Sequence, residues 1–102
     1  MRLAARTDAN HQAVASAYRK CGCSVQSLAA LGDGVPDLLI ACRRLSWLVE
    51  VKDGGKAPSR RKLTDAQMDF HNRWRGAIYI IESAQDVPGN IVAACRDLTG
   101  AA

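Results

Sequence analysis

Three charged residues stand at the ends of two short apolar segments. Asp37 lies at the start of segment 36–42 (PDLLIAC), and Glu50 and Lys52 lie at the end of segment 46–52 (SWLVEVK). Both segments have the length and composition of strands, and the tight connection between them predicts a hairpin. In a hairpin, the start of the first strand lies next to the end of the second. Glu50 and Lys52 are two positions apart and share one face of their strand, so all three side chains are expected to converge.

Two carboxylates and an amine in one place indicate phosphoryl chemistry. Carboxylate oxygens, with the Val51 backbone carbonyl as a candidate third ligand, suit a hard divalent cation such as Mg²⁺. Such a cation polarises a phosphoryl oxygen and lowers the pKa of a bound water. Lys52 can orient or deprotonate that water, or neutralise charge on the phosphate. The alternative is that Glu50 and Lys52 form an ordinary solvated ion pair on a strand surface.

The rest of the pattern predicts a mixed α/β domain with helices packed on a central sheet. Apolar residues at helical spacing indicate a helix over 8–21, and a weak alternation indicates a strand over 24–28. A loop rich in Gly, Pro and charge (53–63) follows the hairpin. The elements expected after it are a helix over 64–74, a strand over 77–81 and a last helix that begins near Pro88.

The length and composition are those of one small globular domain. The 102 residues are expected to form a single domain, 1–102. Hydrophobic residues (48%) and charged residues (24%) are balanced in a way that argues against disordered, collagen-like and coiled-coil proteins. No apolar run approaches the roughly 18 residues of a membrane-spanning helix, and the first residues do not resemble a signal peptide, so a cytoplasmic location is expected. The net charge of +4 permits a polyanionic partner without requiring one.

The four cysteines are expected to be reduced thiols in that compartment. Cys21-Gly22-Cys23 lacks the two-residue gap of a zinc knuckle, and no second Cys or His pair completes it. Cys42 and Cys95 fit best as small buried apolar residues.

The histidines and tryptophans are given no chemical role. His11 and His71 are conceivable general bases, but a lone histidine on a helix is more often a surface or packing residue. Trp47 and Trp74 are expected in the core rather than stacked on bases.

Taken together, the motifs around the hairpin resemble a known family. GVPDLLIACRRLSWLVEVKDG, followed by KLTDAQMDFHNRW, is similar to the VRR-Nuc branch of the PD-(D/E)XK nucleases, in particular to its short stand-alone phage and prophage members. The resemblance covers residues 8–86 and implies an α-β-β-β-α-β core like that of restriction endonucleases, the same order that the sequence pattern predicts. It implies metal-dependent phosphodiester hydrolysis, with Asp37 and Glu50 as metal ligands and Lys52 as the catalytic lysine.

The resemblance also implies the cofactor and the partners. The expected metal is Mg²⁺, with Mn²⁺ as a substitute, and no small-molecule cofactor or membrane is expected. Small stand-alone members of the family suggest a homodimer that cuts branched DNA such as Holliday junctions, in a bacterial host or a phage-infected cell.

Two further positions bear on the implied active site. Gln67 matches the family's helix glutamine, which implies a catalytic role, and the stretch 64–67 (TDAQ) is also a capping box; the two roles are compatible. Relatives often carry a Glu on the first helix as a further metal ligand, where this chain has Asn10 and Gln12. Asn10 is the favoured replacement ligand because it falls on the inner face. The alternative for Asn10 is a buried amide bonded to the sheet backbone.

A run of basic residues with no acid between them follows the predicted metal site. Basic side chains in this place can hold phosphates along a DNA backbone, which gives affinity and salt dependence rather than sequence recognition. The alternative is a solvated, mobile loop. The predicted DNA-binding residues are Arg43, Arg44, Lys56, Arg60, Arg61 and Lys62.

The sequence therefore predicts a metal-dependent endodeoxyribonuclease that acts on branched DNA. One alternative is a catalytically weak or silent DNA-binding module on the same fold, suggested by the missing helix Glu. Another is a small protein without nucleic acid. The presence of Asp37, Glu50 and Lys52 together argues against both alternatives.

Overall fold

The computed structural model describes residues 9–100 and shows a four-stranded mixed sheet with helices on both faces. The strand order is β1-β2-β3-β4; β1 and β3 are both antiparallel to β2, and β4 is parallel to β3. The predicted order of elements is confirmed, with ends that differ by one or two residues. The elements are α1 (Ala9–Lys20), β1 (Ser24–Ser27), β2 (Leu38–Cys42), β3 (Leu45–Val51), α2 (Asp65–Arg73), β4 (Ile78–Ile81) and α3 (Val87–Thr99).

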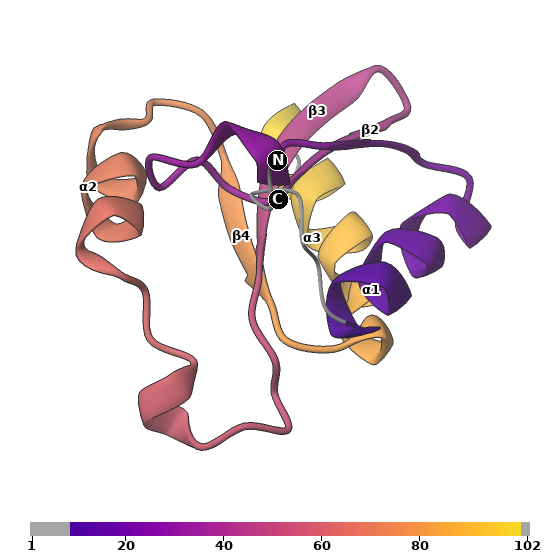
Figure 1. Cartoon of the computed structure of the whole chain (residues 1–102). Helices are drawn as coiled ribbons and strands as arrows, with labels where there is room; N and C mark the ends of the chain where they lie inside the picture. Colours follow the sequence, from indigo (N-terminus) through magenta and orange to yellow (C-terminus); the bar gives the residue numbers. More distant parts are fainter. Residues whose placement is uncertain (1–8, 101–102) are drawn as a thin grey trace.

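Helices α1 and α3 lie next to each other on one face of the sheet, and α2 lies on the other (Figure 1). Alternate residues of β3 serve the two faces, which is the period of a strand. Trp47 and Val49 point into the α1/α3 face, where Val51 also packs against the core. The main buried residues of this core are Val14, Tyr18, Leu38, Ile40, Trp47, Val49, Val87 and Ala94.

The core contains a buried amide, Asn90, whose oxygen accepts two hydrogen bonds. Asn90 of α3 is buried, and its Oδ1 accepts hydrogen bonds from the Tyr18 hydroxyl and from Trp47 Nε1 (3.0 Å). Burial costs little for a polar group that finds partners in this way. Asn90 therefore links α1, β3 and α3 through one acceptor.

The predicted hairpin between β2 and β3 is confirmed, with Arg43 and Arg44 as its two-residue turn. Both residues have positive φ angles, 56° and 68°. Positive φ at both central positions is the type I′ geometry that matches the twist of a hairpin. Non-glycine residues pay about 1 kcal/mol or more for it, so the turn carries some backbone strain.

Two burial predictions are wrong. Trp74 is 46% exposed, because α2 ends at Arg73 and the extended backbone of Trp74 turns its ring out to stack on Phe70. Cys23 is the buried cysteine, while Cys42 and Cys95 are half-buried. Trp47 is in the core as expected.

Candidate active site

Asp37 and Glu50 face each other at one end of the sheet, on the side of α2. The register pairs Leu38 with Val49, so the next position outward pairs Asp37 with Glu50. Asp37 Oδ2 accepts a hydrogen bond of 2.8 Å from the Val51 backbone N–H. This bond explains why β2 begins only at Leu38: the Asp37 side chain bonds to the β3 backbone in place of a ladder bond.

Glu50 is a buried carboxyl, with 1% of its surface exposed. Burial first, and the neighbouring Asp37 carboxyl second, raise the pKa of Glu50 to about 9, and the nearby charge of Lys52 opposes part of this rise. Oε2 accepts a hydrogen bond of 3.2 Å from Gln67 Nε2. Oε1 is buried and has no hydrogen-bond partner among the described residues. A buried acceptor without a donor is costly for a protein that is built only for stability.

Gln67 forms the predicted capping box and also contacts two of the predicted site residues, Glu50 and Lys52. Its backbone N–H donates to the Thr64 hydroxyl, and its Oε1 accepts from the Thr64 backbone N–H at 2.8 Å, which completes the capping box at the start of α2. The same Oε1 accepts a hydrogen bond of 2.8 Å from Lys52 Nζ. The start of α2 is thus tied to Glu50 and Lys52 through one amide, and the catalytic role of Gln67 stays a prediction.

His71 was considered from the sequence only as a general base, and its contact with Glu50 was missed. It lies one helical turn after Gln67, and its Nε2 is 3.5 Å from Glu50 Oε1, the unpartnered oxygen. Burial and the nearby charge of Lys52 lower the pKa of His71, so the contact is that of a neutral imidazole. The spacing of four residues from Gln67 is the signal that could have found it.

Gly34 allows the segment before Asp37 to approach α2. Its φ is +78°, and a Cβ at this position would overlap the backbone carbonyl of Ala66 in the first turn of α2. Only glycine meets both demands without strain. The motif Gly34-Val35-Pro36-Asp37 therefore packs against the helix that carries Gln67 and His71.

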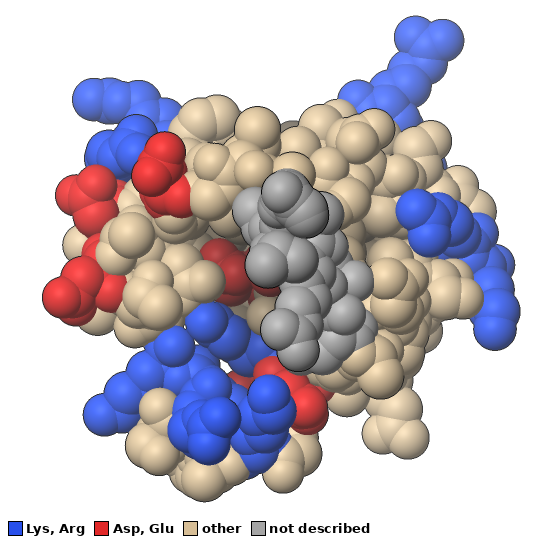
Figure 2. Space-filling view, in the orientation of Figure 1, with Lys and Arg blue, Asp and Glu red and all other residues tan. Residues whose placement is uncertain are grey.

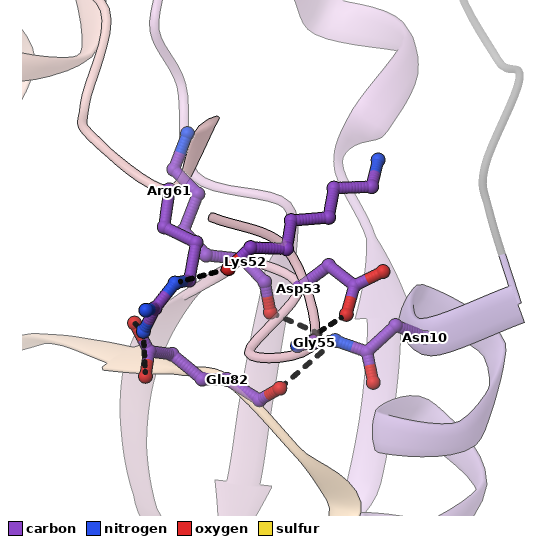
Figure 3. A network of polar contacts seen from close by, with 7 residues as sticks. Asn10, Lys52, Asp53, Gly55, Arg61 and Glu82 are labelled. Carbon is purple, nitrogen blue, oxygen red and sulfur yellow. Dashed lines mark hydrogen bonds and ion pairs between the residues drawn. The ribbon is translucent and has the colours of Figure 1, made fainter. Parts of the chain in front are cut away.

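Asn10 contacts the backbone near the site. Its Nδ2 donates to the carbonyl oxygens of Lys52 (2.7 Å) and Glu82 (3.1 Å), as Figure 3 shows. The predicted alternative, an amide bonded to the sheet backbone, is confirmed. These bonds hold α1 against the ends of β3 and β4. No contact between Asn10 and either site carboxylate is found among the described residues, so its role as a metal ligand stays a prediction, as does that of the Val51 carbonyl.

The loop 53–63 is anchored at its far end by Arg61. Arg61 Nη1 lies 3.2 Å from Glu82 Oε1, and its Nε donates to the Lys56 carbonyl at 2.9 Å (Figure 3). Figure 2 shows one group of Lys and Arg side chains gathered over this loop, at the bottom of the view. The side chains of Lys56, Arg60 and Lys62 are exposed, whereas that of Arg61 forms an ion pair with Glu82.

Arg43 and Arg44 do not lie beside this loop. They form the turn that follows β2, at the end of the strand away from Asp37. The extended chain from position 37 to position 43 spans roughly 20 Å, at about 3.3 Å per residue. The structure therefore divides the predicted DNA-binding residues between two ends of the sheet, and the DNA contacts of both groups stay predictions.

The donor set at the Asp37 end fits a hard divalent cation. Two carboxylates lie together, and the buried Oε1 of Glu50 lacks a donor. Mg²⁺ is commonly held by one or two carboxylates and keeps several waters. Within residues 9–100 no group of three or more His, Cys, Asp or Glu side chains is placed to hold a metal ion. A cation here would therefore depend on Asp37 and Glu50, with water and backbone oxygens completing its shell.

A comparison with solved structures identifies the fold. One structure, described as a VRR_NUC domain, superposes on this chain with a TM-score of 0.59 and 28% sequence identity, and the match covers 79% of this chain and 88% of that chain. This similarity in sequence and fold supports membership in the VRR-Nuc family. No family model matches the chain, and no curated protein matches it either.

The similarity to a VRR_NUC domain points to a nuclease and agrees with the resemblance seen in the sequence. It also confirms the mixed α/β architecture with flanking helices. None of the described helices is both long and apolar enough to cross a membrane.

Proposed function

We propose that this VRR-Nuc domain is a metal-dependent endonuclease that hydrolyses phosphodiester bonds in DNA by PD-(D/E)XK chemistry. The observation that carries the proposal is the buried Glu50 carboxyl beside the half-buried Asp37 carboxyl, with Lys52 held near them by Gln67. Two carboxyl groups this close, one of them buried, are unfavourable for folding even with one Lys nearby, so their presence favours a role in binding a cation.

Asp37 and Glu50 would hold the cation, Mg²⁺ or in its place Mn²⁺. When bound, the ion supplies Lewis-acid activation of the scissile phosphate and of the attacking water. Asp37 keeps its orientation through the Val51 N–H, and Glu50 keeps its orientation through Gln67 Nε2. Fixed ligands of this kind cost no reorganisation when the substrate arrives.

Lys52 is the residue that acts on the water and the phosphate. Its Nζ is held at 2.8 Å from Gln67 Oε1, which fixes the ammonium group beside the carboxylates. From there Nζ orients the attacking water and neutralises negative charge that develops on the phosphate oxygens. A positioned general acid or base contributes on the order of 10²–10⁴-fold to a rate.

Helix α2 carries two side chains that hold the Glu50 carboxyl group in place. Gln67 approaches one oxygen of Glu50 and His71 approaches the other. We assign His71 the role of a positioning residue, because it contacts Glu50 and not the place where substrate would lie. Groups that orient metal ligands are worth about 10–100-fold in metal affinity or activity.

The substrate is DNA, which the exposed basic side chains of the loop contact through phosphates. Lys56, Arg60 and Lys62 are exposed and close in sequence to Lys52. Branched DNA is the preferred form in this proposal, with a homodimer as the active species, because a two-fold pair of sites suits paired cuts across a junction. The resemblance to small stand-alone members of the family supports this finer choice.

A second candidate is a DNA-binding module with little or no activity. The observation that favours it is Asn10, which occupies the helix position where relatives often carry a Glu and which is bonded to backbone carbonyls. A site with two carboxylates instead of three would bind its cation more weakly.

A cleavage panel separates the two candidates. Labelled four-way junction, flap, splayed-arm and plain duplex DNA are incubated with the protein in Mg²⁺, in Mn²⁺ and in EDTA. The nuclease proposal expects metal-dependent cutting, most strongly of the junction, that is lost in Asp37→Asn and Lys52→Ala. Asp69→Asn and Lys20→Ala, which change exposed side chains of the same types, serve as controls and should cut normally.

DNA binding without cutting in any metal would overturn the nuclease proposal and favour the binding module. Cutting of all substrates at equal rates would support the nuclease proposal but overturn the proposed preference for branched DNA. Sedimentation of the protein with and without junction DNA tests the dimer in the same samples.

A further inference from the structure

All four cysteines gather at the end of the sheet away from Asp37. Cys21 and Cys23 flank the turn between α1 and β1, Cys42 ends β2, and Cys95 lies in α3. Burial first, and then the neighbouring thiols of Cys42, Cys21 and Cys95, raise the pKa of Cys23, so the four thiols lie near one another. Three separate parts of the chain thus bring their thiols together, and the proposed nuclease reaction uses none of them.

Cys21, Cys42 and Cys95 line one cavity of about 310 Å³. Its other walls are the side chains of Arg43, Ile91 and Val92. Cys21 is exposed, and Cys42 and Cys95 are half-buried, so small molecules can reach these thiols from solvent.

The strand register places Cys23 directly opposite Cys42. Ser24 pairs with Ala41, so the next positions outward are the two cysteines. At the other end of the same ladder the Leu28 N–H donates to the Asp37 carbonyl, which marks that pair as hydrogen-bonded. Bonded and non-bonded pairs alternate along an antiparallel ladder, which makes Cys23 and Cys42 a non-bonded pair.

Non-bonded pairs bring side chains closest together. Their Cα atoms are about 4.5 Å apart in antiparallel sheets, within the range of roughly 4.4–6.8 Å that disulfides span. Cys23 and Cys42 also face the same side of the sheet, since Cys23 belongs to the α1/α3 core and Cys42 packs against it. The backbone therefore does not have to move for the two sulfurs to bond.

We propose that Cys23 and Cys42 form a reversible cross-strand disulfide by exchange with small disulfides of the glutathione type. Cys42, which lines the cavity, attacks the small disulfide as the thiolate; one sulfur of the small disulfide becomes a mixed disulfide with Cys42, and the other leaves as a thiolate. Cys23 then loses its proton and attacks the Cys42 sulfur, and the second small thiol leaves. Two protein thiols are oxidised to one disulfide, and one small disulfide is reduced to two thiols.

The surroundings favour Cys42 as the point of entry. Cys23 is only 7% exposed, and burial together with Cys42 raises the pKa of its thiol. Cys23 is expected to react second because it lies directly opposite Cys42 in the strand register, within reach of a mixed disulfide on that sulfur. Arg43 lies in the wall of the same cavity and gives it a positive charge that attracts anionic small disulfides.

The disulfide would bind the edge strand β1 covalently to β2. Strand β1 has only four residues, of which Val25 alone is half-buried and the others are exposed. Closing the loop between positions 23 and 42 lowers the entropy of the unfolded chain and should raise the melting temperature by several degrees. Asp37 lies at the other end of β2, so this redox site is independent of the proposed nuclease function.

The test uses the full chain, first reduced and then incubated with oxidised glutathione at neutral pH. Intact-mass analysis and peptide mapping are expected to show loss of two hydrogens and a peptide pair that joins Cys23 to Cys42. The melting temperature should rise and should return when dithiothreitol is added. In Cys42→Ser both changes should disappear, whereas Cys95→Ser, at a matched half-buried thiol of the same cavity, should behave like the wild type.

A disulfide that maps to any other pair, or glutathione adducts without an internal disulfide, would overturn the proposal. An unchanged melting temperature in fully oxidised protein would overturn it as well. The mapping needs no substitution at the buried Cys23, so the test does not depend on the folding of such a variant.

Discussion

The two faces of the sheet differ in whether their buried polar groups have hydrogen-bond partners. On the α1/α3 face, Asn90 accepts two hydrogen bonds inside an apolar core. On the α2 face, Glu50 is buried beside a second carboxyl, and its Oε1 and the Nε2 of His71 find no hydrogen-bond partner among the described residues. The same strands carry both arrangements, because successive residues point to opposite faces. The first face contributes stability, whereas the second keeps charge in place for a ligand at a cost in stability.

The largest expected effect falls on the α2 face. Lys52→Ala should reduce DNA cleavage by on the order of 10³-fold, because Nζ is the group proposed to orient the attacking water. The free energy of unfolding should change by less than about 1 kcal/mol, since Lys52 is half-buried and its side chain is hydrogen-bonded to the amide of Gln67 alone among the described residues. Single-turnover cleavage and urea denaturation of the same preparation measure both. Loss of stability in proportion to loss of activity would contradict the division between the faces.

Asn90→Leu tests the opposite face. The substitution leaves the Tyr18 hydroxyl and Trp47 Nε1 buried without an acceptor, so the free energy of unfolding should fall by about 2–4 kcal/mol. Cleavage per folded molecule should stay unchanged at a temperature where the variant is folded. Val92→Ala, at a position of α3 that is 66% exposed, is the control and should have no effect on stability.

His71→Leu should weaken binding of Mn²⁺ by about 10-fold, because the variant removes the imidazole beside Glu50 Oε1. His71→Gln keeps a donor at this position and should retain most of the affinity. Electron paramagnetic resonance of free Mn²⁺ reports this affinity without any DNA or cleavage. Equal losses in the two variants would mean that His71 only fills space.

The smallest effects are expected in the loop. Arg60→Ala removes an exposed side chain and should lower the salt dependence of DNA binding by about one phosphate contact. Arg61→Ala should instead lower the free energy of unfolding by less than about 1 kcal/mol, because its partly exposed ion pair with Glu82 is screened by solvent. Fluorescence anisotropy of labelled DNA at several salt concentrations measures the salt dependence of binding for the two variants. A larger loss of salt dependence in Arg61→Ala than in Arg60→Ala would reverse the assignment.

Local patterns in the sequence were sufficient to predict the hairpin and the meeting of Asp37 with Glu50. The turn at Arg43 and Arg44 leaves little choice of register, and a strand's period places Glu50 and Lys52 on one face. The capping box of Gln67 was equally visible, because all its members lie within four residues.

Contacts between distant elements could not be read in this way. His71 reaches Glu50 because Gly34 lets α2 approach the sheet; the spacing from Gln67 places the two side chains on one helix face but does not give the distance of that face from Glu50. Arg61 pairs with Glu82 at a separation of 21 residues, an ion pair that local patterns in the sequence do not predict. The exposure of Trp74 depends on the residue at which α2 ends, and helix ends are poorly defined by propensity alone.

The central claim is that the carboxylate pair on the α2 face is a cation site that costs stability when empty. Glu50→Gln keeps the shape and removes a carboxyl that must take up a proton on folding at neutral pH, so the metal-free variant should be more stable than the wild type by about 1–3 kcal/mol. Because folding raises the pKa of Glu50 above its usual 4.5, the wild type loses stability as the pH rises from 4.5 towards about 9, and this difference should grow.

Urea denaturation of both proteins, with Mg²⁺ and with EDTA, measures this directly. Mg²⁺ should stabilise the wild type and leave Glu50→Gln unchanged, since a ligand stabilises only the folded state that binds it. A metal-free Glu50→Gln that is less stable than the wild type, together with a wild type that does not respond to Mg²⁺, would contradict the claim.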